Sequence, residues 1–146
     1  MSPLQFAVPV GALESVAGEL PYAILAFIVL SLVTRHFEYS SHERAVDDGA
    51  ESLSRSVPHV VVSALAVAAS FLYMIVHPHS GMVISVLVTG TVLTDFFEFE
   101  SRLVEARNDL ELERPKAAIA AGLLSLGYAA YISLFWIVRE QWVSIV

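Results

Sequence analysis

Residues 117–138 read AAIAAGLLSLGYAAYISLFWIV, a run of 22 residues without a charged side chain. Crossing the hydrocarbon core of a bilayer, roughly 30 Å thick, takes about 20 apolar helical residues. The run is therefore long enough for a transmembrane helix. It predicts that the chain is an integral membrane protein surrounded by the lipid bilayer.

Three further apolar stretches precede this run. The first and third are close to the short limit of about 17 residues and borrow polar residues at their ends. We expect an all-α fold, an integral membrane bundle of four transmembrane helices, with three spans as the alternative if the first stretch lies at the membrane surface. The expected helices lie at about residues 21–37, 58–76, 82–100 and 117–138.

The segments between these stretches predict the connections. Pro78 and Gly81, in the sequence HPHSG at residues 77–81, are helix breakers and predict a tight turn between the second and third helices. The third helix keeps a helical periodicity beyond its apolar part and is expected to extend to about residue 113. Longer cytoplasmic loops are expected at about residues 38–57 and 101–116, within a single membrane domain that covers residues 1–146.

The composition agrees with a membrane protein and excludes several function classes. Hydrophobic residues make up 56% of the chain, against about 45–50% apolar residues in ordinary soluble domains. The 15 acidic residues outnumber the 8 Lys and Arg, which argues against a nucleic-acid partner because phosphate binding needs clustered positive charge. Cysteine is absent, which excludes disulfides and thiolate chemistry. Because no catalytic motif occurs, we expect neither an enzyme nor a cofactor.

The distribution of Lys and Arg predicts the orientation. Seven of these eight residues lie in or beside the two expected loops, and only Arg139 lies on the other side. Because basic loops stay in the cytoplasm, we expect both loops inside and both termini outside, in a multi-pass protein of the cell membrane. Residues 1–19 contain no Lys or Arg, so no secretory signal peptide is expected there.

The strongest candidate for a polar site is the sequence TDFFEFE at residues 94–100. Asp95 and Glu98 share one helix face, and Asp95 lies ~20 Å from Met82 along the helix axis. Acidic groups inside a membrane usually mark an ion path, a proton relay or a paired charge.

Two interpretations of these acids remain open. In the first, Asp95 forms an ion pair with Arg35, which ends the first helix at a similar depth, and Glu98 pairs with Arg102 four positions along the helix. In the second, the acids belong to an ion or proton relay. The candidates for this relay are Asp95, Glu98, Arg35, His36 and His59.

A metal site is a weaker hypothesis. His36 and His59 are close in depth to Glu38, Asp95 and Glu98, and together these side chains have the hard character that suits a divalent cation. The HExxH spacing that makes such an assignment strong is missing. We therefore predict no metal.

Small residues on the last helix predict close helix packing. Small side chains at every fourth position let helix backbones approach each other within a membrane. The packing partner is either another helix of this chain or another subunit. The residues are Ala117, Ala121, Ser125, Ala129 and Ser133, with Ala118 and Gly122 beside them.

These features favour a non-enzymatic scaffold or accessory subunit of a membrane complex. Its partner would be a second copy of the chain or a larger assembly. The alternative is an oligomeric ion or proton transporter that uses Asp95 with Glu98.

Four strings carry a family resemblance: VHPHSGM at residues 76–82, LTDFFEFE at 93–100, VEARNDL at 104–110 and ERPK at 113–116. From about Tyr22 to the C-terminus, the chain resembles a family of small uncharacterised multi-pass membrane proteins of halophilic archaea, a domain of unknown function. The resemblance implies a salt-loving host and a plasma-membrane location. The acidic composition with a single lysine is typical of such a host. The family has no assigned activity and therefore supplies no functional residues.

Overall fold

The structure is a computed structural model in which residues 9–146 are described. Residues 1–8, part of the segment in which no signal peptide is expected, lie outside the described residues. Within residues 9–146 the elements are α2 (Val10–Val16), α3 (Leu20–Asp47), α4 (Val57–Val76), α5 (Pro78–Arg107) and α6 (Lys116–Ile145). Four of these helices, α3 to α6, are long and apolar enough to cross a membrane. The expected all-α fold with four such helices is confirmed.

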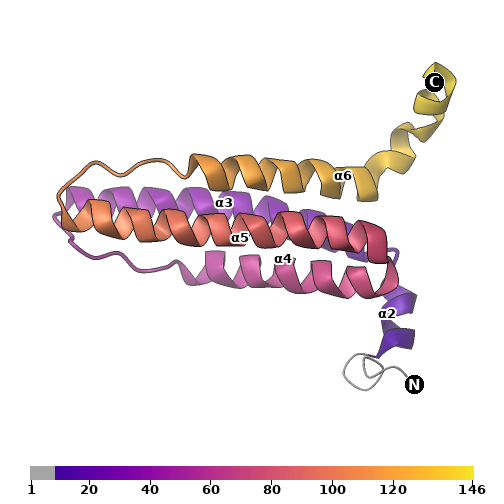
Figure 1. The fold of residues 1–146 in the computed structure, drawn as a ribbon, viewed down its shortest axis with the longest axis horizontal. Helices are drawn as coiled ribbons and strands as arrows, with labels where there is room; N and C mark the ends of the chain where they lie inside the picture. The colour runs from indigo at the N-terminus through magenta and orange to yellow at the C-terminus, as the bar shows by residue number, and fades with distance from the viewer. Residues whose placement is uncertain (1–8) are drawn as a thin grey trace.

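The four long helices form a bundle (Figure 1). α3 packs against α4 and α6, and α5 packs against the same two helices, so α3 and α5 occupy opposite corners. The connections at residues 48–56 and 108–115 lie at one end, which we call the loop end. The α4–α5 turn, α2 and the last turns of α6 lie at the other end, which we call the termini end.

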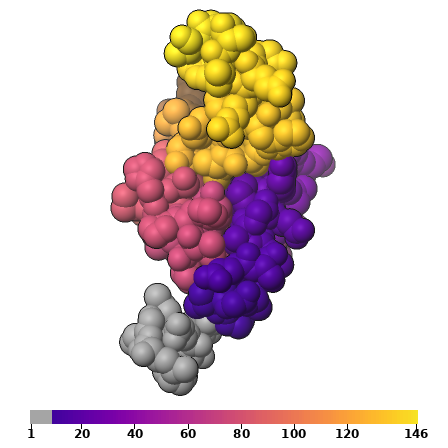
Figure 2. All heavy atoms as spheres, turned by 90° about the vertical axis from the view of Figure 1, so that its right-hand side faces the viewer, coloured from indigo at the N-terminus to yellow at the C-terminus, as the bar shows by residue number. Residues whose placement is uncertain are grey.

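The last turns of α6 extend past the other helices at the termini end. Figure 2 looks at this end and shows them standing apart from α3 and from the α4–α5 turn. Most of their side chains are exposed. Trp136 ties this part of α6 to the start of α3, because its Nε1 donates to the hydroxyl of Tyr22 at 2.7 Å.

Apolar side chains from all four long helices fill the middle of the bundle. The buried members of this core are Ile24, Ile28, Ala66, Ala69, Tyr73, Ile84, Val88 and Ala129. Gly81 lies in the first turn of α5, and a Cβ atom there would overlap the backbone of Met74 on α4. The glycine therefore lets α4 and α5 approach closely directly after His77, the single residue between them.

Two helices are longer at the loop end than their apolar stretches alone predict. α3 continues to Asp47, so residues 38–47 of the expected loop are helical. α5 continues past its apolar stretch, which was expected to end at residue 100, but it ends at Arg107 and does not reach the expected end near residue 113. A second, smaller core explains the continuation, because it gives both helices an apolar contact beyond the main core. Its buried members are Tyr39, Leu53, Phe99, Ala106 and Leu112.

Both extended helices end in the same C-terminal motif. After α3, Gly49 has a φ of +91°, its N–H bonds the carbonyl of Val46, and the N–H of Ala50 bonds the carbonyl of Ala45. After α5, Asp109 takes the left-handed position with a φ of 56°, and the N–H of Leu110 bonds the carbonyl of Glu105. These are Schellman motifs, which satisfy carbonyl groups that the helix itself leaves unpaired.

Gly81→Ala should destabilise the bundle by about 1–3 kcal/mol, because the added methyl group forces the α4 and α5 backbones apart. The matched control is Gly127→Ala on α6, where a Cβ meets no atom within 4 Å. The free energy of unfolding in mild detergent, measured by denaturant titration, compares the two variants. Equal stability of both variants would contradict the close approach at Gly81.

Candidate functional site

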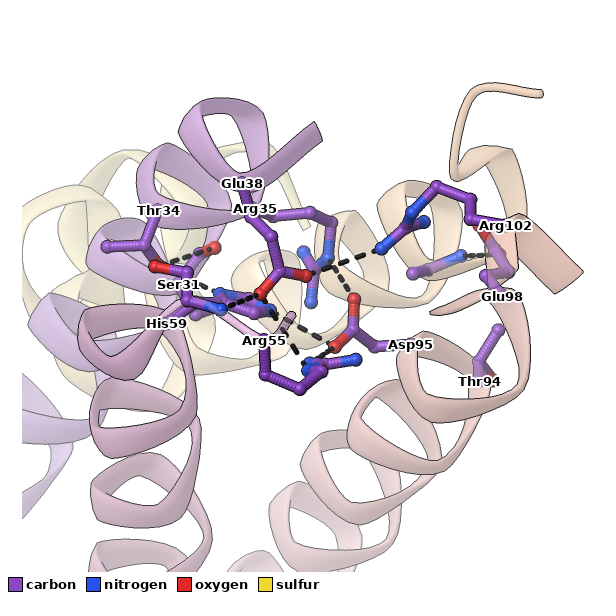
Figure 3. A network of polar contacts seen from close by, with 12 residues as sticks. Ser31, Thr34, Arg35, Glu38, Arg55, His59, Thr94, Asp95, Glu98 and Arg102 are labelled. Atoms are coloured by element: carbon purple, nitrogen blue, oxygen red, sulfur yellow. Dashed lines mark hydrogen bonds and ion pairs between the residues drawn. The ribbon is translucent and has the colours of Figure 1, made fainter. Parts of the chain in front are cut away.

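The carboxylate of Asp95 on α5 is the centre of a polar cluster near the loop end (Figure 3). Arg35 on α3 donates from Nε to Asp95 Oδ1 at 3.3 Å. Arg55, in the α3–α4 connection, donates from Nη2 to Asp95 Oδ2. His59 in the first turn of α4 places its Nε2 3.1 Å from Oδ2. One carboxylate thus joins three separate segments of the chain.

Glu38, one turn after Arg35 on α3, is the second carboxylate of the cluster. Arg102 on α5 donates from Nη2 to Glu38 Oε1 at 3.3 Å. Arg55 places its Nε 3.7 Å from Glu38 Oε2, and the backbone N–H of Ser56 donates to the same oxygen at 2.8 Å. Arg55 therefore bridges the two carboxylates. We call Arg35, Glu38, Arg55, His59, Asp95 and Arg102 the buried ion-pair network.

Phe99 supports the two arginines that approach from the loop end. The guanidinium of Arg55 lies 4.6 Å from the ring centroid of Phe99, and that of Arg102 lies 5.9 Å from it. A cation within about 6 Å of an aromatic face is attracted by the ring quadrupole. The ring therefore supports both guanidinium groups, of which that of Arg102 is buried and that of Arg55 is partly exposed.

Five of the six members of the network are almost inaccessible to solvent, and only the side chain of Arg55 is partly exposed, at 27%. The exposed fractions are 3% for Arg35, 2% for Glu38, 0% for His59, 3% for Asp95 and 2% for Arg102. Charges at such depth are costly unless they are paired and hydrogen-bonded, and removing one partner leaves the others uncompensated. The members of the network therefore stabilise the fold only as a set.

His42, one turn beyond Glu38, extends the network outward. Arg102 donates from Nε to His42 Nδ1 at 3.1 Å, and His42 Nε2 lies 2.9 Å from the carbonyl oxygen of Ser54. An arginine Nε is always a donor and a carbonyl oxygen only accepts. The hydrogen of His42 must therefore be on Nε2, and the ring is neutral.

The protonation of His59 depends on a neighbouring hydroxyl. Thr34 Oγ1 lies 2.8 Å from His59 Nδ1 and 3.2 Å from the carbonyl oxygen of Ser31. The hydroxyl carries one hydrogen. If it donates to His59 the imidazole is neutral, and if it donates to Ser31 then Nδ1 carries a hydrogen and His59 is an imidazolium beside Asp95.

The five relay candidates from the sequence occupy three different places. Arg35, His59 and Asp95 lie together in the network, and the expected contact between Arg35 and Asp95 is present. Glu98 lies apart, where its Oε1 accepts from the backbone N–H of Ala118 at 2.7 Å and so caps the start of α6. His36 is exposed. Arg102, expected beside Glu98, pairs with Glu38 instead.

The small residues of α6 point mostly into the bundle. Ser125 is buried and lies 3.1 Å from Thr91 Oγ1 on α5, oxygen to oxygen. A Cβ atom at Gly122 would lie 2.9 Å from Leu32 Cδ2 and 3.3 Å from Arg35 Nη1 on α3. Ala118, Gly122, Ala129 and Ser133 are buried as well, Ala121 is half-buried and Ala117 is exposed.

Three potential metal ligands converge in the network. Glu38, His59 and Asp95 each offer a ligand atom, and these atoms lie within 4.8 Å of one another. Both carboxylates already accept from guanidinium groups. A divalent cation here would meet the positive charges of three arginines at close range, so the geometry favours ion pairs over metal binding.

The family model of a domain of unknown function, DUF7313, matches residues 2–146 of the chain. The chain belongs to the DUF7313 family. No curated protein and no solved structure matches it. The predicted membership in an uncharacterised family is therefore confirmed, and the arrangement of side chains in this DUF7313 chain is the basis for a functional conclusion.

Several members of the site were not assigned from the sequence. Arg55 and His42 lie in a segment expected to be a loop, where no helical periodicity predicts that their side chains point inward. A signal was present in the spacing of Arg35, Glu38 and His42, which places all three on one face if the first helix is continued past residue 37. On α5, Asp95, Phe99 and Arg102 repeat in the same way.

Asp95→Asn should lower the free energy of unfolding by about 3–5 kcal/mol, because the buried Arg35 and the partly exposed Arg55 lose their shared counter-charge. The control, Glu100→Gln, removes the same charge from an exposed position on the same helix and should have little effect. Denaturant titration in mild detergent measures both. A loss as small for Asp95→Asn as for Glu100→Gln would contradict a structural role for the network.

Proposed function

We propose that the chain is a multi-pass membrane scaffold or accessory subunit without catalytic activity of its own. The observation that carries this proposal is that the charged side chains of the network contact other segments of the same chain. Groups engaged in this way hold helices in position. They are poorly placed to bind or convert a substrate.

The length of two helices supports a role in assembly. α3 has 28 residues and α5 has 30, which at 1.5 Å per residue gives lengths of about 42–45 Å, against roughly 30 Å for the apolar core of a bilayer. The loop end would therefore project beyond the hydrocarbon as a rigid platform. Its exposed acidic residues include Glu43, Asp47, Asp48, Glu51, Asp109, Glu111 and Glu113.

The proposal includes an orientation and a location. The positive-inside distribution of Lys and Arg supports a cytoplasmic loop end with both termini outside, in the cell membrane. The excess of acidic residues and the single lysine support a salt-loving archaeal host, as the family resemblance implies. The partner is a larger membrane complex or a second copy of the chain, reached through the loop end.

Purification from the native membrane in gentle detergent tests the scaffold. We expect a partner at fixed stoichiometry, identified by mass spectrometry. The double variant Asp47→Lys, Asp48→Lys should lower recovery of the partner about tenfold. The acidic loop end suits a basic partner surface, and lysines facing that surface would place like charges across the interface, which costs several kcal/mol. The control Glu14→Lys, Glu19→Lys reverses two exposed acids at the termini end and should leave recovery unchanged. Recovery of the chain with no partner and no second copy would contradict the proposal.

A second candidate function, proton transport, has one specific observation in its favour. Thr34, His59 and Asp95 form a continuous hydrogen-bonded chain whose hydrogens have two possible arrangements. The adjoining internal cavity, which is lined by Ser31, Ser63, Thr91 and Ser125 with Arg35, has a volume of about 10 Å³. That is close to the room one water needs.

Proton flux into liposomes separates the two candidates. If the chain is a proton transporter, the wild-type protein should acidify the lumen and Thr34→Val should slow this at least tenfold, because it removes a member of the hydrogen-bonded chain without changing any charge. The control is Thr94→Val, which removes a hydroxyl that bonds only the carbonyl of Gly90. Wild-type liposomes without proton flux would contradict this second function and leave the scaffold unaffected.

A further inference from the structure

A narrow crevice lies between α3 and α6 close to the loop end. It has a volume of about 80 Å³, several times the room that one water needs. Its polar lining is basic: Arg35 and His36 come from α3, and Arg114 comes from the connection just before α6. No acidic side chain lines it, although the rest of the loop end is rich in exposed acids.

Arg35 contributes a positive charge to the wall of this crevice. Its Nε is engaged with Asp95, and its Nη1 is buried without a hydrogen-bond partner. Nη1 lies on the side of the guanidinium that faces Gly122 of α6, which does not line the crevice. Arg35 therefore acts on an anion in the crevice through its charge, and the exposed Arg114 and His36 supply the hydrogen-bond donors.

The crevice is apolar on one side and basic on the other. Leu32 and Ile119 line the part that lies within the apolar helices, and Ile119 is 39% exposed. His36 and Arg114 are exposed and lie toward the loop end. In a membrane-inserted bundle this order matches the order of a phospholipid, whose acyl chain lies toward the bilayer centre and whose phosphate lies at the surface.

We propose that this crevice binds one anionic phospholipid. The phosphate oxygens accept from the guanidinium group of Arg114, with His36 beside them and the positive charge of Arg35 behind them, and the first part of an acyl chain lies against Leu32 and Ile119. Basic pockets between transmembrane helices on the cytoplasmic side are known to bind anionic head groups. The inference needs the membrane location proposed above and is independent of whether the chain has a protein partner.

Complementary charge and the apolar wall select this occupant. The crevice lining carries three basic side chains and no acidic one, which favours an anion with several acceptor oxygens, since guanidinium groups bind phosphate in a bidentate manner. A free phosphate ion would leave Leu32 and Ile119 without a partner, whereas a lipid covers them with its acyl chain. The occupant is therefore a lipid and not a soluble anion.

Native mass spectrometry of the full chain released from detergent tests the proposal. Protein incubated with equal amounts of phosphatidylglycerol and phosphatidylcholine of the same acyl chains should retain one phosphatidylglycerol. Arg114→Gln should lower this retention about tenfold, because it removes a charge-assisted contact to phosphate without touching the network. The matched control, Arg107→Gln, removes an exposed arginine from the end of α5 outside the crevice and should retain the lipid as the wild type does.

A second variant and a competitor complete the test. His36→Gln, exposed in the wild type, should also reduce retention of phosphatidylglycerol, which keeps the proposal testable if Arg114→Gln does not fold. Inorganic phosphate at millimolar concentration should not displace the lipid. Equal retention of the two lipids, equal losses in Arg114→Gln and Arg107→Gln, or displacement by inorganic phosphate would each overturn the proposal.

Discussion

The pairing of Asp95 with Arg35, Arg55 and His59 is the interaction on which the loop end of this bundle depends. The acidic group lies on α5, and its partners come from α3, from the α3–α4 connection and from α4. In a medium of low polarity, none of these charges can be left without its partners. The connection that carries Arg55 is therefore held against the bundle, and the relative positions of three helices are fixed by one carboxylate.

The same constraint explains why α3 and α5 continue past their apolar stretches. Glu38 and Arg102 pair beyond the Asp95 cluster, and the smaller core with Phe99 at its centre packs around them. Helices gain most of their stability from packing, so a polar stretch remains helical where tertiary contacts reward it. Schellman motifs at Gly49 and Asp109 then end both helices and return the chain across the loop end.

The carboxylates of the network already have partners, whereas the basic side chains of the crevice have no acidic side chain in its lining. The carboxylates of the network are occupied by arginines, which supports a structural role for them and disfavours a cation site between Glu38, His59 and Asp95. Outside the network, exposed basic groups of His36 and Arg114 line the crevice beside α6. The occupied carboxylates are the basis of the proposed scaffold, and the basic crevice is the basis of the proposed lipid site.

The sequence by itself determined the helical class, the four apolar helices and a break near residues 77–81, because each depends on local composition or on helical period. The structure shortens that break to His77, with Pro78 and Gly81 in the first turn of α5. The sequence left the contact between Arg35 and Asp95 as one of two interpretations. It did not determine the partners of Glu38 and Glu98, or the inward position of Arg55 and His42. Those contacts join residues 12 to 64 positions apart. Only the tertiary structure decided them, because helix order and the path of a polar connection depend on how all the buried charges are neutralised together, and no local pattern encodes that requirement.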